Sequence, residues 1–352
     1  MKQPMNLNIK RIISVVIFSI HSVFHLSSQT QMNAELIYST ELETAFGERL
    51  NWANLIQTNF DLSFKKNNKQ NYGKLRINLI TTIQTYSGKL VNDLQGFSNI
   101  REKDYLLSPF LVGYSYYLSN NELFVGLRNI NEDYFTTDYT SLFTQSSAGI
   151  HPTLSANYNL ANYPYSGLSL FLETNPTSSI RLRTSIYNAA AGAVFVKDES
   201  PFVFGKNGVF LIQDCLLQNE IWKCNIGILS QFKFNERFRD FVVWGVMEKC
   251  IFTNARLDIG ILGEASYAFN PDIECSTFMS AGLVFDGLIG EKKKNICGLQ
   301  FYYAKYKERS DLDMELTWRY QMNKYCVLQP ALHIIKTEKW HPAALFRFIV
   351  QI

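Results

Sequence analysis

The sequence predicts an all-β protein, specifically a transmembrane antiparallel β-barrel of about 16 strands. Aromatic residues make up 14% of the 352 residues, yet the mean hydropathy is only −0.08. No run of about 18 apolar residues follows the N-terminal region, which excludes helical membrane spans. Strands of roughly 10 residues with alternating polarity explain both observations, because one face meets lipid and the other a polar lumen.

Four segments show this alternation most clearly, at residues 76–86, 180–188, 256–269 and 314–323. Successive side chains of a strand point to opposite faces, so each segment has an apolar and a polar face. A soluble β-sandwich would alternate too, but the repeated charges on the second face favour a barrel. We expect the lipid face to carry Leu257, Ile259, Ile261, Leu316, Trp318 and Tyr320, and the lumen face to carry Arg256, Asp258, Glu315 and Arg319.

Turn-forming residues separate these segments and divide the chain into about 15 candidate strands. Single-chain bacterial barrels have an even number of strands, which favours 16 and leaves 14 or 18 open. The segment 343–352 alternates as well and is expected to be the closing strand. Long irregular stretches at 89–108, 131–166 and 189–207 contrast with the short turns, as is typical of outer-membrane barrels.

Residues 1–28 have the features of a signal peptide. Lys2, Lys10 and Arg11 precede an apolar stretch at 12–26, and small residues follow it. We expect cleavage near Ser28, which leaves residues 29–352 as one outer-membrane barrel domain; a membrane anchor is the alternative. Removing three positive charges and no acidic ones brings the formal net charge of +3 to zero. The charge therefore gives no reason to expect a nucleic-acid partner.

Cysteine and histidine usage argues against a metal site, a cofactor or an enzyme. The six cysteines contain no CxxC pair. Cys215 and Cys224 could form a disulfide across a hairpin, but we favour the interpretation that all six are small apolar residues on strands. Only His151, His333 and His341 remain after the leader, and none lies in a hydrolase motif. An enzyme that uses only Asp or Glu is left as a minor alternative.

The segment 123–164 carries a combination of short motifs: Gly-Leu-Arg at the end of a strand, an Asn/Asp-rich turn, Ser-Leu-Phe, a Ser-Ser-x-Gly-x-x-Pro run and Tyr-Pro. This segment resembles the carbohydrate-selective porins of the OprB type, and 185–188 and 329–333 resemble later strands of that family. The matching residues are Gly126, Leu127, Arg128, Asn129, Asn131, Asp133, Phe135, Ser141, Leu142, Phe143, Ser146, Ser147, Gly149, Pro152, Tyr163 and Pro164.

The resemblance implies a 16-stranded channel in the outer membrane of a Gram-negative-type bacterium, through which mono- and oligosaccharides diffuse passively past loops that constrict the lumen. A general, non-selective porin is the alternative, and a homo-oligomer is left open. Sugars need short polar groups, planar donors and aromatic faces, although Asn and Asp are also common turn formers and strand arginines are often merely solvated. The expected pore-lining residues are Arg128, Asn129, Asn131, Asp133, Tyr134, Arg181, Arg183, Arg256 and Arg319.

Overall fold

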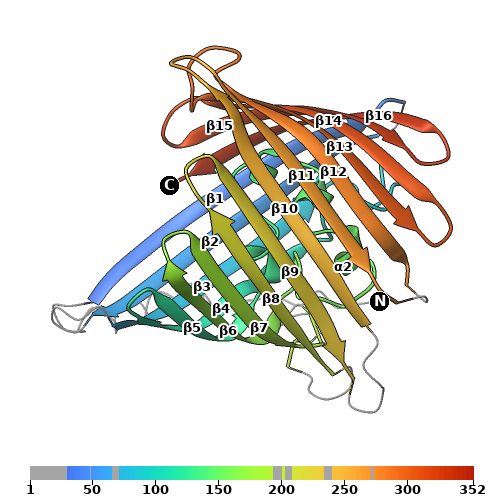
Figure 1. Ribbon diagram of the computed structural model, residues 1–352. Coiled ribbons are helices and arrows are strands. Elements are labelled where there is room, and N and C mark those ends of the chain that lie inside the picture. The colour runs from blue at the N-terminus through green and yellow to red at the C-terminus, as the bar shows by residue number, and fades with distance from the viewer. Residues whose placement is uncertain are drawn as a thin grey trace, which may run out of the picture.

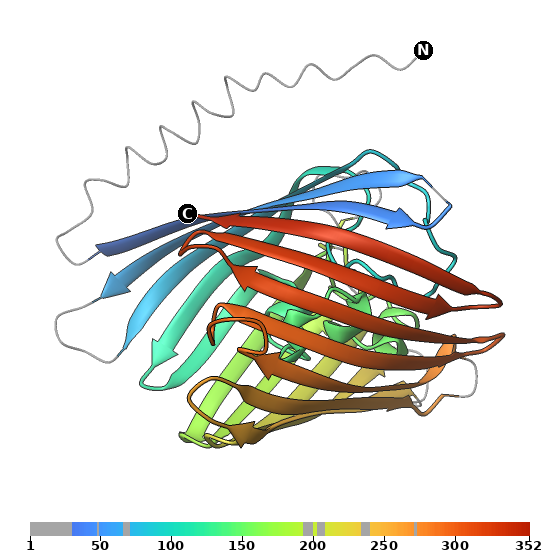
Figure 2. The ribbon, with the colours of Figure 1, turned by 90° about the horizontal axis from the view of Figure 1, so that it is seen from above.

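Sixteen strands in the described part of the chain form one closed antiparallel barrel (Figures 1 and 2). The structure is a computed structural model that describes residues 30–47, 49–65, 71–192, 200–202, 208–233, 240–270 and 273–352. Each strand pairs with the strands before and after it, and β1 closes the ring by pairing with β16. The predicted antiparallel barrel and its count of 16 strands are confirmed. The expected signal peptide lies outside the described residues.

The strands differ in length, and this difference shapes the wall. The two longest have 16 residues and the shortest has 8. Their bounds are β1 (Thr30–Ala45), β2 (Leu50–Lys65), β3 (Tyr72–Gln84), β4 (Tyr105–Leu118), β5 (Asn121–Arg128), β6 (Gly167–Thr177), β7 (Ile180–Asn188), β8 (Val209–Gln218), β9 (Trp222–Phe232), β10 (Asp240–Thr253), β11 (Asp258–Ala268), β12 (Cys275–Asp286), β13 (Asn295–Tyr306), β14 (Ser310–Gln321), β15 (Cys326–Lys336) and β16 (Trp340–Gln351).

The helices of the described residues are short, and all of them lie between β5 and β6. They are three 3-10 turns, η1 (Ile130–Glu132), η2 (Thr140–Leu142) and η3 (Ser146–Ala148), and the α-helix α2 (Pro152–Ser155). Among the described residues, no helix has the length and apolar composition required to cross a bilayer.

Three long connections lie at the end of the barrel opposite the C-terminus, after β3, β5 and β7; the third, residues 189–208, lies partly outside the described residues. We name residues 85–104, between β3 and β4, the rim segment, and residues 129–166, between β5 and β6, the inner segment. The connections at the other end include turns of two residues, between β4 and β5 and between β6 and β7. Short turns at one end and long loops at the other are characteristic of outer-membrane barrels, whose long loops face the cell exterior.

Exposure alternates along the strands as the sequence predicts. In β14, Leu316 is 50% exposed on the outer surface, whereas its neighbour Glu315 is fully buried on the inner side. In β11, Ile261 is exposed and Glu264 is buried. The assignment of lipid-facing and inward-facing residues is thus confirmed in the middle of both strands.

The same assignment is wrong at the start of β11. Arg256, expected on a strand facing the lumen, lies in an exposed turn, and β11 begins only at Asp258. The side chain of Asn254 sets this boundary, because its Oδ1 accepts the backbone N–H groups of Arg256 at 2.7 Å and of Leu257 at 2.8 Å. Asn commonly folds back on the backbone in this way, which ends the strand pattern.

All six cysteines are free and lie on strands, which confirms the interpretation favoured above. Cys215 pairs across the sheet with Ile226, and Cys224 pairs with Leu217. The two cysteines therefore sit diagonally on neighbouring strands and are not directly opposite each other.

Candidate functional site

The inner segment leaves the barrel wall at Arg128, where β5 ends after 8 residues while β4 runs for 14. Gly126 precedes this point with a φ of +147°, and a Cβ there would lie 2.4 Å from the backbone oxygen of Val112. Only glycine fits so close to the neighbouring strand. The chain consequently turns into the barrel at the Gly-Leu-Arg motif singled out in the sequence.

Arg128 anchors this departure and is only 3% exposed. Its guanidinium lies 4.7 Å from the centre of the Phe124 ring and 4.1 Å from that of Phe171, and it forms a forked ion pair with Asp133. Stacking on aromatic faces and bidentate pairing are the two interactions that a buried arginine makes best. Arg128 thus holds the start of the inner segment and is not free to meet a solute.

The asparagines of this turn are also engaged within the segment. Asn129 is fully buried, accepts the N–H of Asn131 at 2.8 Å and donates to the backbone oxygen of Tyr165. Asn131 donates to the backbone oxygen of Gly149 at 3.1 Å and accepts from Tyr163 at 3.3 Å. These contacts match the alternative interpretation of the Asn residues as turn formers and differ from the expectation that they line the pore.

The inner segment packs against the inward-facing side chains of strands around the ring. Tyr134, another expected pore-lining residue, is fully buried, and its hydroxyl lies 2.7 Å from Ser185 Oγ on β7. Thr153 makes a 2.6 Å hydrogen bond to Ser266 on β11, and Asn157 accepts the N–H of Cys275 on β12 at 2.8 Å. A segment that contacts β7, β11 and β12 in this way lies inside the ring (Figures 1 and 2).

Large apolar side chains fill the space between the inner segment and the wall. Phe135 packs against Trp244 of β10 with ring centres 4.8 Å apart, and Leu142 and Phe143 join a second cluster with residues of β10 to β13. The tip of the segment reaches further: Tyr139 donates its N–H to Glu248 at 2.9 Å, and its ring covers Gly260 of β11. One sector of the barrel interior is thus packed like a protein core.

A row of carboxylates on β14 holds both segments. Glu315 accepts the backbone N–H groups of Thr144 at 2.7 Å and Gln145 at 3.1 Å. Asp311 accepts the N–H of Leu94 in the rim segment at 2.7 Å. Such charge-assisted hydrogen bonds are stronger than neutral ones. We name Asp311, Asp313 and Glu315 the β14 carboxylate row, which attaches both segments to the barrel wall.

The rim segment is attached to the wall by a second set of charges and meets the inner segment there. Ser98 donates to Glu41 on β1 at 2.6 Å, and Arg347 on β16 pairs with Glu41 and donates to Asn99. The N–H of Ser146 donates to the backbone oxygen of Gly96 at 2.9 Å. The two segments therefore form one continuous assembly across the end of the barrel.

A sector of wall formed by β2, β3 and β5 carries partly exposed charges of both signs. Lys74 pairs with Asp61 at 2.6 Å, and Arg76 lies 3.8 Å from Asp61 and 3.4 Å from Glu122. Glu132 of the inner segment is exposed and accepts a weak 3.5 Å hydrogen bond from Asn78 of β3. We name Asp61, Lys74, Arg76, Glu122 and Glu132 the charged array. In this array the charged side chains of the barrel wall lie opposite the carboxylate of Glu132 in the inner segment.

None of the five members of the charged array was among the expected pore-lining residues. The alternation of 76–86 places Arg76 on the polar face, but nothing in the sequence distinguishes it from the other strand arginines. Glu132 lies within the Asn/Asp-rich turn, where its neighbours seemed the better candidates. Arg76 and Glu132 stand out only in the folded barrel, where β3 lies opposite η1.

The remaining expected residues are widely separated. Arg183 is 7% exposed and engaged by an ion pair with Asp214 and a hydrogen bond to the backbone oxygen of Asp133, so it differs from the expectation of a free donor. Arg181 lies near the β6–β7 turn, 3.6 Å from Glu173. Arg319 is half-buried on the inner side of β14, and no hydrogen bond joins its guanidinium to another described residue. Of the strand arginines named in advance, Arg319 is the best placed to meet a solute.

Within the described part of the chain, no three His, Cys, Asp or Glu side chains come together in a way that could hold a metal ion.

The barrel resembles several solved porin structures, although no family model and no curated protein matches the sequence. The high-pH structure of OprB from Pseudomonas putida aligns with a TM-score of 0.75 over 91% of this chain and 93% of that one, at 11% sequence identity. The fold is that of a porin. OmpT from Vibrio cholerae, in its trimer form, gives a TM-score of 0.60 at 9% identity over 92% of this chain and all of OmpT. A triple mutant of the Rhodopseudomonas blastica porin gives 0.61 at 8% identity, again over 92% of this chain and all of that porin. At such identities the porin likeness concerns architecture, and solute preference has to be argued from this chain's own residues.

Proposed function

We propose that the chain is an outer-membrane porin of a Gram-negative-type bacterium that lets small polar solutes diffuse passively, with a preference for mono- and oligosaccharides. The charged array carries this proposal. Arginine and carboxylate groups that face each other offer fixed donors and acceptors to the hydroxyls of a sugar. Charges of both signs also give neither cations nor anions a strong advantage, which favours neutral solutes.

Weak binding is part of the proposal, because a solute that is held tightly cannot leave a channel. Each hydrogen bond to the charged array would contribute only about 0.5–1.5 kcal/mol net. Arg319, on the inner side of β14, is proposed as an additional donor. The general porin, which sorts solutes by size alone, is the competing proposal.

The test is single-channel current in planar bilayers with added glucose or maltose, compared with an amino acid of similar size. Arg76→Ala and Glu132→Gln should each weaken the sugar block of ion current several-fold and leave a conducting channel. Arg256→Ala, in an exposed turn, is the matched control and should keep the sugar block. A wild-type channel that shows no sugar block and passes amino acids as fast as sugars would favour the general porin.

Export and assembly belong to the same proposal. Residues 1–28 would be removed as a leader, and N-terminal sequencing of the membrane fraction should then find a first residue near Gln29, not Met1. The likeness to OmpT, which is described in a trimer form, supports a homo-oligomer. Its mass in mild detergent would be a multiple of the protomer mass.

A further inference from the structure

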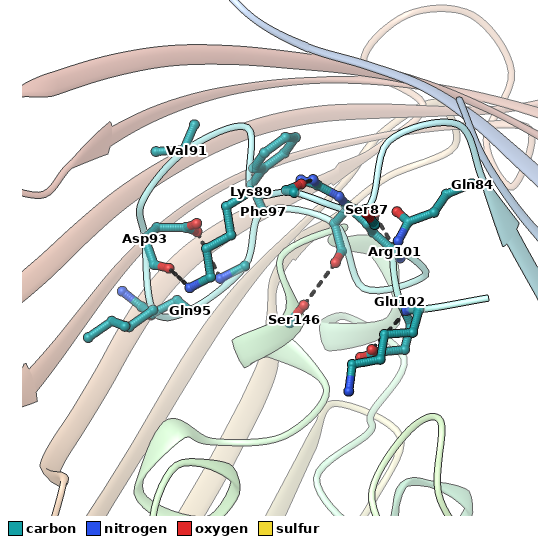
Figure 3. A pocket seen from close by; sticks show the side chains of 15 residues that line it. Gln84, Ser87, Lys89, Val91, Asp93, Gln95, Phe97, Arg101, Glu102 and Ser146 are labelled. Carbon is teal, nitrogen blue, oxygen red and sulfur yellow. Dashed lines mark hydrogen bonds between the residues drawn. The ribbon is translucent and has the colours of Figure 1, made fainter. Parts of the chain in front are cut away.

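The rim segment lines an open cavity that the channel function does not by itself require. The cavity has a volume of 330 Å³, and its lining comes from the rim segment, the adjoining end of β3 and Ser146 of the inner segment (Figure 3). We propose that this cavity binds one ring of a neutral sugar, as a capture site at the channel end that carries the long connections. The inference deepens the proposed function and rests on it.

Three of the charged groups that line the cavity are already engaged by the protein. Arg101 donates to the backbone oxygen of Gly88 and lies 3.6 Å from Glu43. Asp93 accepts the N–H of Gly96 at 2.8 Å, and Lys89 donates to the backbone oxygen of Asp93 at 2.8 Å. Figure 3 shows Lys89, Asp93 and Arg101 around the cavity. An ionic ligand would have to compete with these interactions. Glu102 and Lys103 add one further charge of each sign to the lining.

Two glutamine side chains offer hydrogen-bond acceptors that no described residue occupies. The Oε1 atoms of Gln84 and Gln95 are buried and accept no hydrogen bond from the described residues, and Gln95 is only 6% exposed. The amide nitrogen of Gln95 donates to the backbone oxygen of Asp311 at 3.3 Å, which holds the side chain in place. A buried acceptor without a donor is unfavourable. A ligand rich in hydroxyl groups and without net charge would satisfy both acceptors.

The size of the cavity limits the ligand further. Ligand pockets in proteins span roughly 300–1,000 Å³, so this cavity falls at the small end and suits a single ring. Burial raises the pKa of Asp93 to about 6, with the nearby Asp313 adding to the effect. The cavity thus keeps its full set of charges at pH 7.5 and loses one negative charge near pH 5.

The inference can be tested by saturation-transfer NMR with D-glucose on the full chain in detergent micelles at pH 7.5. Gln84→Leu and Gln95→Leu each remove one acceptor at nearly constant volume and should weaken glucose binding about two- to tenfold. Gln57→Leu, a half-buried glutamine of β2 outside the cavity, is the matched control. Heat-modifiability on gels verifies that each variant is a folded barrel.

Glucose binding that is equal in wild type, Gln84→Leu and Gln95→Leu would overturn the inference, as would tighter binding of lysine than of glucose. The failure of the proposed function gives a different pattern. A channel without sugar preference in bilayers, whose glucose signal still falls in Gln95→Leu, would keep the capture site and refute the selective channel. A sugar-selective channel whose glucose binding is unchanged in both glutamine variants would keep the proposed function and refute the capture site.

Discussion

Single buried arginines organise the interior of this barrel. Arg128 and Arg183 are each less than 10% exposed, and each is paired with a carboxylate, Asp133 and Asp214 respectively. Pairing makes burial of the charge tolerable, whereas the removal of one partner leaves the other charge buried and uncompensated. These two arginines, which looked like solute ligands in the sequence, therefore hold the structure together, and their loss should affect folding before it affects transport.

Arg183→Ala should destabilise the barrel by about 3–5 kcal/mol, because Asp214 would remain buried without its partner. The double variant Arg183→Ala/Asp214→Ala should recover part of this loss, since it removes both charges. The measurement is the urea midpoint followed by tryptophan fluorescence. If the single variant unfolds at the wild-type midpoint, the pair is not the structural element described here.

Arg319→Ala should shift the ion selectivity of the channel toward cations, because it removes a positive charge that no carboxylate of the described residues neutralises. The reversal potential in a salt gradient measures this shift. Arg256→Ala removes the same charge from an exposed turn and serves as the control. Equal reversal potentials for the wild type and Arg319→Ala would place Arg319 away from the ion path.

At the scale of a single element, β14 combines two surfaces with different demands. Its outer face carries Leu312 and Leu316, which are 38% and 50% exposed, and its inner face carries the β14 carboxylate row. A shift of register by one residue would place three carboxylates in lipid. The strand is thus fixed in register by both faces together, which explains why its alternation was so clear in the sequence.

Leu316→Arg should impair folding, because an arginine at the middle of the lipid face costs roughly 2–4 kcal/mol in outer-membrane barrels. Gln321→Arg, at a half-buried inward position of the same strand, is the matched control. Thr317 is less suitable, since it is only 1% exposed and an arginine there would not fit. Heat-modifiability after refolding into lipid vesicles measures the difference. Equal folding of both variants would contradict the assignment of Leu316 to the lipid face.

At the scale of the whole molecule, the shell and the interior differ in how far the sequence predicts them. The shell follows from alternation, which is local: the pattern of each strand repeats every two residues. The even strand number follows from closing the ring with every neighbouring pair antiparallel. The interior depends on contacts between distant residues. Glu315 and Thr144 are 171 residues apart, and no local pattern indicates that one holds the other. Arg76 and Glu132 were overlooked for the same reason.

The attachment of the inner segment to β14 leads to a prediction for the whole channel. Glu315→Gln retains the shape of the side chain but removes the charge that holds two N–H groups of the inner segment. We expect a looser segment and noisier single-channel current, since a hydrogen bond to a charged group is worth about 1.5–3 kcal/mol. Glu291→Gln, in the exposed β12–β13 turn, is the control. Unchanged current noise in Glu315→Gln would show that the carboxylate row is dispensable for holding the segment.

The β14 carboxylate row also has a consequence for the time course of folding. The groups that dock the two segments come late in the chain: Asn99 binds Arg347, which is 248 residues further on. Contacts of such long separation require the closure of large loops, and chains dominated by them fold slowly. The barrel must therefore bring its last strands into place before its interior can become ordered. Until then the polypeptide is an unclosed sheet whose two long segments are unattached. An intermediate captured at that stage should be digested by protease at 85–104 and 129–166 while its early strands are already protected.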